Sequence, residues 1–181
     1  MKIITDRLIL RNMSEEDRND CFAIFMNDDV CRYLPYYAWT DKEKDSKFNE
    51  KLAHDSLKEK HILDLAVEYD SRMIGVVSAW YSTMKETVEI GYVFNKEYYK
   101  NGYATEAVFA LCTNLFKEEN VHRIYADTDT RNVDSYRLLE RIGMRREAHF
   151  ISDYYAKDEW TDSYIYGMLR NDLDQSIFKK Q

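Results

Sequence analysis

The hydrophobic positions near the N-terminus change from a strand-like to a helix-like spacing. Leu8 and Leu10 alternate with their neighbours in residues 2–11, KIITDRLILR, which predicts a strand. Residues 14–17, SEED, then form a capping box, in which acidic side chains occupy the first turn and suit the helix dipole. We expect the helix that follows to end near Asn27.

A second helix is predicted after an aromatic loop, RYLPYYAW, that contains the only proline, Pro35. Residues 40–43, TDKE, form another capping box, and Phe48, Leu52 and Leu57 give the segment behind it an apolar stripe.

In the next three segments the hydrophobic residues recur with a period of two, as in a strand. Residues 62–69, ILDLAVEY, and 73–81, MIGVVSAWY, alternate on either side of the turn DSR, which predicts a hairpin. Residues 87–94, TVEIGYVF, predict a third strand.

The C-terminal half alternates between helices and strands. Apolar residues at helical spacing predict a helix: Ala104, Val108, Leu111, Cys112, Leu115 and Phe116. Residues 122–129, HRIYADTD, predict a strand, and residues 132–142 predict a helix that Gly143 ends. Two aromatic-rich segments, 149–155 and 163–169, predict the last strands.

The resulting order, β-α-α-β-β-β-α-β-α-β-β, predicts an α+β fold. The central hairpin and the two final strands indicate a largely antiparallel sheet, and the unit from Val88 to Asp127 adds one parallel pair. No repeat or linker divides the chain, so we expect one domain over residues 1–181, with a short polar tail from about residue 175.

Composition narrows the possible functions. The chain has 181 residues with a net charge of −7, which argues against a nucleic-acid partner. Three cysteines without a CxxC pair, and four scattered histidines, favour a reduced cytoplasmic protein with no metal site. No apolar run is long enough to cross a membrane, and the N-terminus lacks the features of a signal peptide.

The stretch YYKNGYATEAV, residues 98–108, lies between a predicted strand and a predicted helix. Backbone N–H groups at a helix N-terminus bind anions, and Gly102 allows close approach of the backbone. The alternative is a simple tight turn. The stretch is not a P-loop, since no GK[ST] follows, nor a dinucleotide fingerprint, which needs more glycines.

Four blocks of the sequence together resemble the GNAT N-acetyltransferases, in particular the RimJ/RimL-like branch that acetylates protein N-terminal amines. They are TDRLILRNMSEED, VEIGYVFNKEYYKNGYATEAV, the helix NVDSYRLLERIGM and the closing EWTDSYIYGML. Two positions depart from the pattern: Tyr99 replaces a common Gln or Arg, and Met144 replaces the Phe of a Gly-Phe pair.

The resemblance implies the acyl-CoA N-acyltransferase fold, a mostly antiparallel sheet of six to seven strands with one splayed parallel pair, and acetyl-CoA as donor. The implied pyrophosphate loop comprises Tyr99, Lys100, Asn101, Gly102, Tyr103, Ala104 and Thr105. The implied contacts to the pantetheine arm are Val93, Phe94, Asn95, Asn132 and Ser135, with strand-like pairing at the first three.

Two residues are candidates for the chemistry. Strand alternation places Glu89 on one face with Gly91 and Val93, where a carboxylate in a desolvated cleft can act as general base. The alternative is a cross-strand ion pair with an Arg or Lys. Many relatives use a tyrosine as the thiolate's acid, but Leu139 stands at that position here. The resemblance assigns this role to Ser135, which matches the serine of the branch; otherwise Ser135 caps its helix or contacts CoA.

The acceptor is expected to be a primary amine, foremost the N-terminus of a protein such as a ribosomal protein. The resemblance points to aromatic walls for it: Tyr33, Tyr36, Tyr37, Trp39, Tyr154 and Tyr155. Alternatives are a small-molecule N-acetyltransferase acting on an aminoglycoside, polyamine or amino acid, and a CoA-binding sensor without catalysis. Exposed aromatic residues are also compatible with an interface between two copies of the chain in a homodimer.

Overall fold

The computed structural model describes residues 1–173, so the predicted polar tail lies outside the described residues. The described chain forms one mixed sheet in the order β1-β2-β3-β4-β5-β6-β8-β7. The strands are β1 (Lys2–Ile4), β2 (Ile9–Asn12), β3 (Ile62–Tyr69), β4 (Arg72–Tyr81), β5 (Thr87–Phe94), β6 (Arg123–Asp129), β7 (Arg145–Ala156) and β8 (Glu159–Leu169).

The sheet has eight strands in this part of the chain, rather than six to seven, because the predicted first strand is two. The Thr5 N–H donates to the Leu8 carbonyl at 3.0 Å, and the Leu8 N–H donates to the Thr5 hydroxyl at 2.9 Å. These bonds fold the segment into a turn, and β1 and β2 pair with each other.

The helices are α1 (Arg18–Phe25), α2 (Asp28–Cys31), α3 (Lys44–Leu52), α4 (Tyr103–Glu118) and α5 (Val133–Arg141). The first capping box forms, since the Ser14 N–H donates to the Asp17 carboxylate at 2.8 Å. The helix behind it ends earlier than predicted. The Asn27 side chain accepts the N–H groups of Asp29 and Val30, so a new short helix, α2, starts there.

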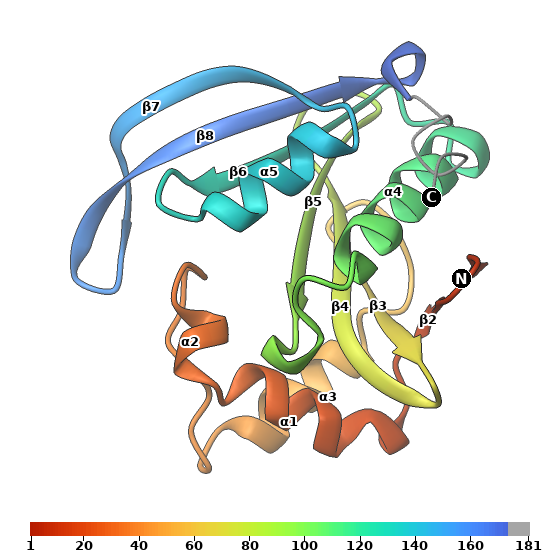
Figure 1. Ribbon diagram of the computed structural model, residues 1–181, viewed down its shortest axis with the longest axis vertical. Helices are drawn as coiled ribbons and strands as arrows, with labels where there is room; N and C mark the ends of the chain where they lie inside the picture. The colour runs from red at the N-terminus through yellow and green to blue at the C-terminus, as the bar shows by residue number, and fades with distance from the viewer. Residues whose placement is uncertain (174–181) are drawn as a thin grey trace.

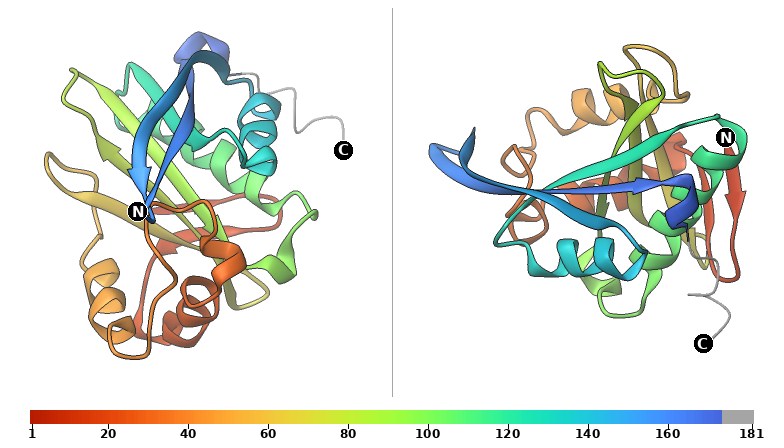
Figure 2. Two further views of the ribbon diagram at one scale, coloured as in Figure 1. Left: turned by 90° about the vertical axis from the view of Figure 1, so that its left-hand side faces the viewer. Right: turned by 90° about the horizontal axis from the view of Figure 1, so that it is seen from above.

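Helices cover both faces of the sheet (Figures 1 and 2). On one face α1 and α3 pack through Phe25 and Phe48 against Ala66 and Val76 of the sheet. On the other face α4 and α5 pack on the larger core. Leu57, predicted on the stripe of the second helix, lies beyond the end of α3 and packs against the larger core instead.

The parallel pair of strands, β5 and β6, opens into a fork. They pair only from Thr87 to Glu89 with Arg123 to Tyr125. Beyond these residues β5 continues along β4 while β6 continues along β8, and the two strands separate (Figure 1). The fork therefore opens directly after Glu89, and the pocket described next lies at that place.

Candidate active site

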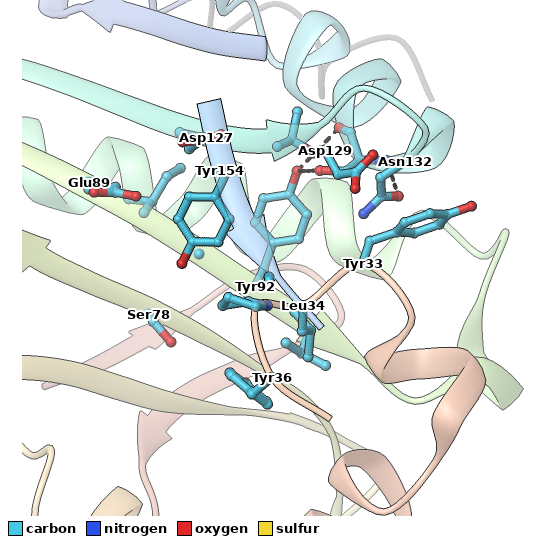
Figure 3. A pocket seen from close by; sticks show the side chains of 18 of the residues that line it. Tyr33, Leu34, Tyr36, Ser78, Glu89, Tyr92, Asp127, Asp129, Asn132 and Tyr154 are labelled. Carbon is cyan, nitrogen blue, oxygen red and sulfur yellow. Dashed lines mark hydrogen bonds between the residues drawn. The ribbon is translucent and has the colours of Figure 1, made fainter. Parts of the chain in front are cut away.

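A cavity of about 450 Å³ lies at the fork (Figure 3). Ser78, Trp80 and Glu89 line it from β4 and β5. The segment between α1 and α3 and the β7–β8 hairpin contribute further walls, including Tyr33 and Tyr154. The first turn of α5 borders the same cavity. The site therefore combines residues that are far apart along the chain.

Glu89 lies at the vertex of the fork and has neutral hydrogen-bond partners. Tyr125 Oη donates to its Oε2 at 2.7 Å, and Trp80 Nε1 donates to the same oxygen at 3.2 Å. Its other oxygen, Oε1, has no hydrogen-bond partner within residues 1–173. The cross-strand ion pair considered as an alternative does not form in the described residues, which leaves a carboxylate oxygen free to accept a proton.

A second carboxylate, Asp127, lines the same cavity. It follows Tyr125 by two residues on β6, so both side chains leave the same face of the strand, and Figure 3 shows Asp127 near Glu89. Solvent in the cleft reaches Asp127, but protein surrounds it elsewhere. This partial burial disfavours the charged carboxylate and, together with the negative charges of Glu89 and Asp153, raises the pKa of Asp127 to about 6.

The first turn of α5 brings Ser135 and Asn132 to the cavity. Asn132 is the N-cap residue, and its Oδ1 accepts the Ser135 N–H at 3.3 Å. The Ser135 hydroxyl lies 2.8 Å from the hydroxyl of Tyr92, which also lies 3.2 Å from the Ser135 carbonyl oxygen. Asn132 thus serves as the cap, and the Ser135 side chain remains available to the cavity.

The loop before α4 has the backbone form of an anion cradle. Lys100 and Gly102 are left-handed, with φ of 65° and 79°. The N–H groups from Lys100 to Thr105 have no acceptor in the described part of the chain, whereas that of Tyr99 donates to the Lys96 carbonyl at 3.2 Å. These free amides stand at the N-terminus of a 16-residue helix. The residues present therefore fit a phosphate or pyrophosphate.

Cationic and hydroxyl groups border this loop. Arg141, at the end of α5, donates from Nη1 to the Thr105 hydroxyl at 3.0 Å. The Thr105 hydroxyl keeps its own proton for another acceptor. Arg141 was not predicted as a site residue, because only the fold brings the end of α5 to the start of α4.

The predicted pantetheine contacts on β5 differ in their surroundings. Val93 lines the cavity, whereas the Phe94 ring is buried in the core beside Gly75. Asn95 has its N–H bonded to the Ile74 carbonyl at 2.8 Å and its carbonyl bonded to the Tyr98 N–H at 3.0 Å. Its role toward the donor stays a prediction.

A charge cluster around the buried Asp64 forms another wall of the cavity. Asp64 accepts hydrogen bonds from Ser78, from His54 Nδ1 at 2.7 Å and from Lys51 Nζ at 3.1 Å. Burial pushes the pKa of Asp64 up, but the bonds from His54, Lys51 and Ser78 hold it below its usual value. Asp64 is therefore an ionised, fully partnered side chain that fixes this wall.

Three of the six predicted acceptor aromatics line the cavity: Tyr33, Tyr36 and Tyr154. Trp39 does not, because its ring stacks on Phe25 at 4.6 Å in the core under α1. Tyr37 and Tyr155 also lie outside the lining. Tyr37 donates to Asp158 at 3.2 Å, and the Tyr155 ring contacts Trp160.

The tip of the β7–β8 hairpin is hydrogen-bonded to the C-terminal end of α2. Lys157 Nζ donates to the carbonyl oxygens of Cys31 at 2.5 Å and Arg32 at 3.0 Å. Arg131, next to α5, pairs with Glu159 of the same hairpin at 2.9 Å. These contacts join the two walls that enclose the cavity.

Sequence reasoning missed Asp127 and Tyr92. The alternation in HRIYADTD does place Asp127 with Tyr125, and pairing with the Glu89 strand is the signal that would have found it. Tyr92 has the alternation of the buried residues Val88 and Ile90, so its pattern indicates core packing and conceals its contact with α5.

No helix within residues 1–173 is long and apolar enough to cross a membrane. All three cysteines are free and buried. Burial raises the pKa of Cys21 and of Cys112 to about 12. Neither thiol therefore has the properties of a nucleophile.

Comparison with known proteins identifies the family. The sequence model of the acetyltransferase (GNAT) domain matches residues 7–145. The chain is 33% identical over 172 residues to YnaD, an uncharacterized N-acetyltransferase of Bacillus subtilis (strain 168), covering 95% of this chain and 99% of YnaD. A GNAT-family acetyltransferase from Bacillus anthracis has a similar crystal structure, with a TM-score of 0.85 and 31% identity over 94% of this chain and 99% of that one.

Two solved enzymes with different acceptors share the fold at lower identity. RimL, a ribosomal alpha-N-protein acetyltransferase solved with coenzyme A, has a TM-score of 0.80 and 17% identity. The spermidine N-acetyltransferase of Vibrio cholerae, solved with CoA and spermine, has a TM-score of 0.78 and 18% identity. Each comparison covers 93% of this chain and 98% of the other. The predicted fold and enzyme class are confirmed: the chain belongs to the GNAT acetyltransferase family and is an N-acetyltransferase with acetyl-CoA as donor.

Proposed function

We propose that the enzyme acetylates a primary amine held between Glu89 and Asp127, and that this amine is the N-terminus of a protein or peptide. The observation that carries the proposal is the pair of carboxylates itself. Neither Glu89 nor Asp127 forms an ion pair within residues 1–173, whereas the cavity's Asp64 and Asp129 do. An ammonium group supplies the missing positive charge, and its deprotonation needs a nearby base.

The donor side follows from the loop and the fork. The free amides from Lys100 to Thr105 suit the pyrophosphate of acetyl-CoA, with Gly102 allowing close approach. Val93 of β5 and Asn132, which both line the cavity, would contact the arm of the donor. A backbone N–H at Val93 or Phe94 is the proposed donor to the oxyanion, a contact worth roughly 3 kcal/mol in other acyl-transfer enzymes.

The transfer itself needs two proton movements. Glu89 takes one proton from the acceptor ammonium through its free Oε1, either directly or through water. The neutral amine attacks the thioester carbonyl, and the C–S bond breaks with its electron pair on sulfur. In the second movement a proton passes from the nitrogen to the sulfur, which gives an amide and a thiol. The Ser135 hydroxyl is the proposed hydrogen-bond donor to the departing sulfur.

The charges of the cavity favour a peptide over a polyamine. Apart from Glu89 and Asp127, the carboxylates that line it are already paired: Asp64 with Lys51, and Asp129 and Glu159 with Arg131. A polyamine that placed one ammonium at Glu89 would bring further ammonium groups to carboxylates that these cations already neutralise. A peptide presents only one charge at its N-terminus and polar amide groups beyond it. The two unpaired carboxylates are the observation that keeps a polyamine as the second candidate.

The proposal is tested by measuring CoA release with peptides, polyamines, aminoglycosides and amino acids. Thiol reagents suit this assay because the three cysteines of the protein are buried. We expect turnover with a free-amine peptide and none with the same peptide acetylated at its N-terminus. Turnover with polyamines alone would replace the first candidate by the second.

Paired variants test the carboxylates. Glu89→Gln and Asp127→Asn should each lower kcat/KM for the acceptor while the KM of acetyl-CoA changes little. Glu147→Gln is the matched control, since Glu147 pairs with Arg123 and does not line the cavity. Equal activity of Glu89→Gln and the control would remove Glu89 from the mechanism.

A further inference from the structure

The hydroxyl groups of Tyr92 and Ser135 connect the two arms of the fork. Tyr92 is on β5, three residues beyond the last residue paired with β6, and Ser135 is on the helix that follows β6. Their oxygens are 2.8 Å apart, within ordinary hydrogen-bond distance. Both residues line the cavity, and Figure 3 shows Tyr92 beside the Asn132 end of α5.

The position of Ser135 alone does not determine where its hydroxyl proton points. A serine in the first turn of a helix can rotate its hydroxyl among local acceptors. Here the backbone N–H of Ser135 is bonded to Asn132, so the backbone is held while the side chain is free to turn. The Tyr92 hydroxyl lies 2.8 Å from Ser135 Oγ and also donates to the Ser135 carbonyl oxygen at 3.2 Å, so its one proton is shared between the two acceptors, with the shorter contact to Oγ.

Tyr92 is poorly suited to be the acid itself. Its side chain packs against the larger core, and burial raises the pKa of its phenol well above the ordinary value, although the bond to Ser135 opposes this effect. A phenolate left there after proton transfer would be a buried charge without a cation. The phenol therefore stays neutral over the working pH range and can act as a fixed hydrogen-bonding group.

We propose that Tyr92 is a positioning residue: its O–H donates to Ser135 Oγ and leaves the serine's own O–H directed into the cavity, toward the departing sulfur. This inference rests on the role proposed above for Ser135. Tyr92 neither gains nor loses a proton in the reaction; the proton balance at nitrogen and sulfur is unchanged. Leu139 stands at the position on α5 where many relatives have a tyrosine. Here a tyrosine on β5 supports proton donation to the sulfur instead, through Ser135.

A double-mutant cycle tests the inference with Tyr92→Phe, Ser135→Ala and the combined variant. Tyr92→Phe keeps the ring and removes only the hydroxyl. We expect it to lower kcat about tenfold, the effect of losing one hydrogen bond, with the KM of acetyl-CoA nearly unchanged. The combined variant should be no slower than Ser135→Ala, because the phenol acts only through the serine.

The matched control is Tyr136→Phe. Tyr136 neighbours Ser135 on α5, but its ring packs against Tyr164 at 5.8 Å, so kcat should not change. Circular dichroism and the thermal shift caused by acetyl-CoA verify that each variant folds and binds the donor. A variant that keeps both but loses kcat has lost positioning rather than structure.

The possible failures are distinguishable. Unchanged kcat in Ser135→Ala would refute the role of Ser135 and, with it, the positioning by Tyr92. A slow Ser135→Ala together with a fully active Tyr92→Phe would refute the positioning alone. So would effects of the two substitutions that multiply in the combined variant, since these would indicate independent contributions.

Discussion

Arg7 forms an ion pair with Glu106 and a hydrogen bond to the loop that carries Gly102. Arg7 Nε donates to Glu106 Oε2 at 2.6 Å, and the Arg7 backbone N–H donates to Oε1 at 3.0 Å. The Thr5 hydroxyl donates to the same Oε1 at 2.6 Å. Arg7 Nη1 also donates to the Asn101 carbonyl at 3.0 Å. The turn between β1 and β2 thus holds both the loop and the first turn of α4.

Arg7→Ala should raise the KM of acetyl-CoA several-fold while kcat stays within about twofold. The substitution removes a charge-assisted bond to Glu106 and the bond to Asn101, together worth about 1.5–3 kcal/mol. The loop amides then sample more arrangements before the donor binds. Steady-state kinetics with varied acetyl-CoA measure the change.

Arg123→Ala is the control for Arg7→Ala, because Arg123 forms a comparable pair with Glu147 away from the loop. It should lower stability without changing the KM of acetyl-CoA. Equal KM values for the two variants would contradict a specific role of Arg7 in the loop.

Gly102→Ala should weaken the binding of acetyl-CoA in addition to lowering the stability of the fold. Gly102 has φ of 79°, where an alanine costs roughly 1–2 kcal/mol. An added Cβ would also stand 3.4 Å from Arg7 Nη2. If the loop relaxes to avoid this strain, its amides no longer converge, and isothermal titration with CoA should report a higher Kd.

Gly143→Ala is the matched control for Gly102→Ala. Gly143 has a similar φ of 94° but ends α5, where an added Cβ would meet the Asp172 carbonyl oxygen at 3.3 Å. The melting temperature of the Gly143→Ala variant should fall, while its affinity for CoA should stay unchanged. An unchanged Kd in Gly102→Ala, despite a lower melting temperature, would exclude the loop as the pyrophosphate site.

Local patterns predicted most of the fold. The hairpin of β3 and β4, the strand β5 and the helix α4 appeared where alternation and helical spacing placed them. The errors occurred where a side chain redirects the backbone. Thr5 turns the first strand, and Asn27 starts a new helix, through bonds that hydrophobic periodicity does not encode.

The site was partly predictable for the same reason. Glu89 could be found because its strand has strict alternation and a recognisable loop follows. Tyr92 and Arg141 could not, because their partners, Ser135 and Thr105, lie on other elements that only the fold brings near. Loop aromatics have no period at all, so Trp39 was placed at the acceptor when it belongs to the core.

Asp127 should produce an acidic limb in the pH profile. The pKa of Asp127, about 6 in the folded protein, is above the ordinary value of 3.8, so below about pH 6 this carboxyl group is protonated and no longer attracts the acceptor ammonium. We expect kcat/KM for the acceptor to fall as the pH drops through this value, and Asp127→Asn to flatten the limb.

The same raised pKa has a consequence for stability that does not depend on activity. The protonated form of Asp127 is favoured on folding, so its stabilising contribution is complete below pH 3.8 and is lost as the pH rises to about 6. Relative to Asp127→Asn, the wild type should therefore lose stability over this interval. Parallel melting curves of the two proteins would contradict the raised pKa.

Lys157→Met should weaken binding of the acceptor and leave binding of the donor unchanged. The substitution keeps the hydrocarbon stem but removes the two bonds to the carbonyls of Cys31 and Arg32. A charge-assisted bond contributes about 1.5 kcal/mol, which corresponds to roughly tenfold in the population of the fastened hairpin. We expect a several-fold higher KM for the acceptor and an unchanged KM for acetyl-CoA. Lys44→Met, which removes an exposed pair with Asp41 at the start of α3, is the control. If Lys157→Met changed both KM values equally, the hairpin contact would stabilise the whole fold rather than the acceptor wall.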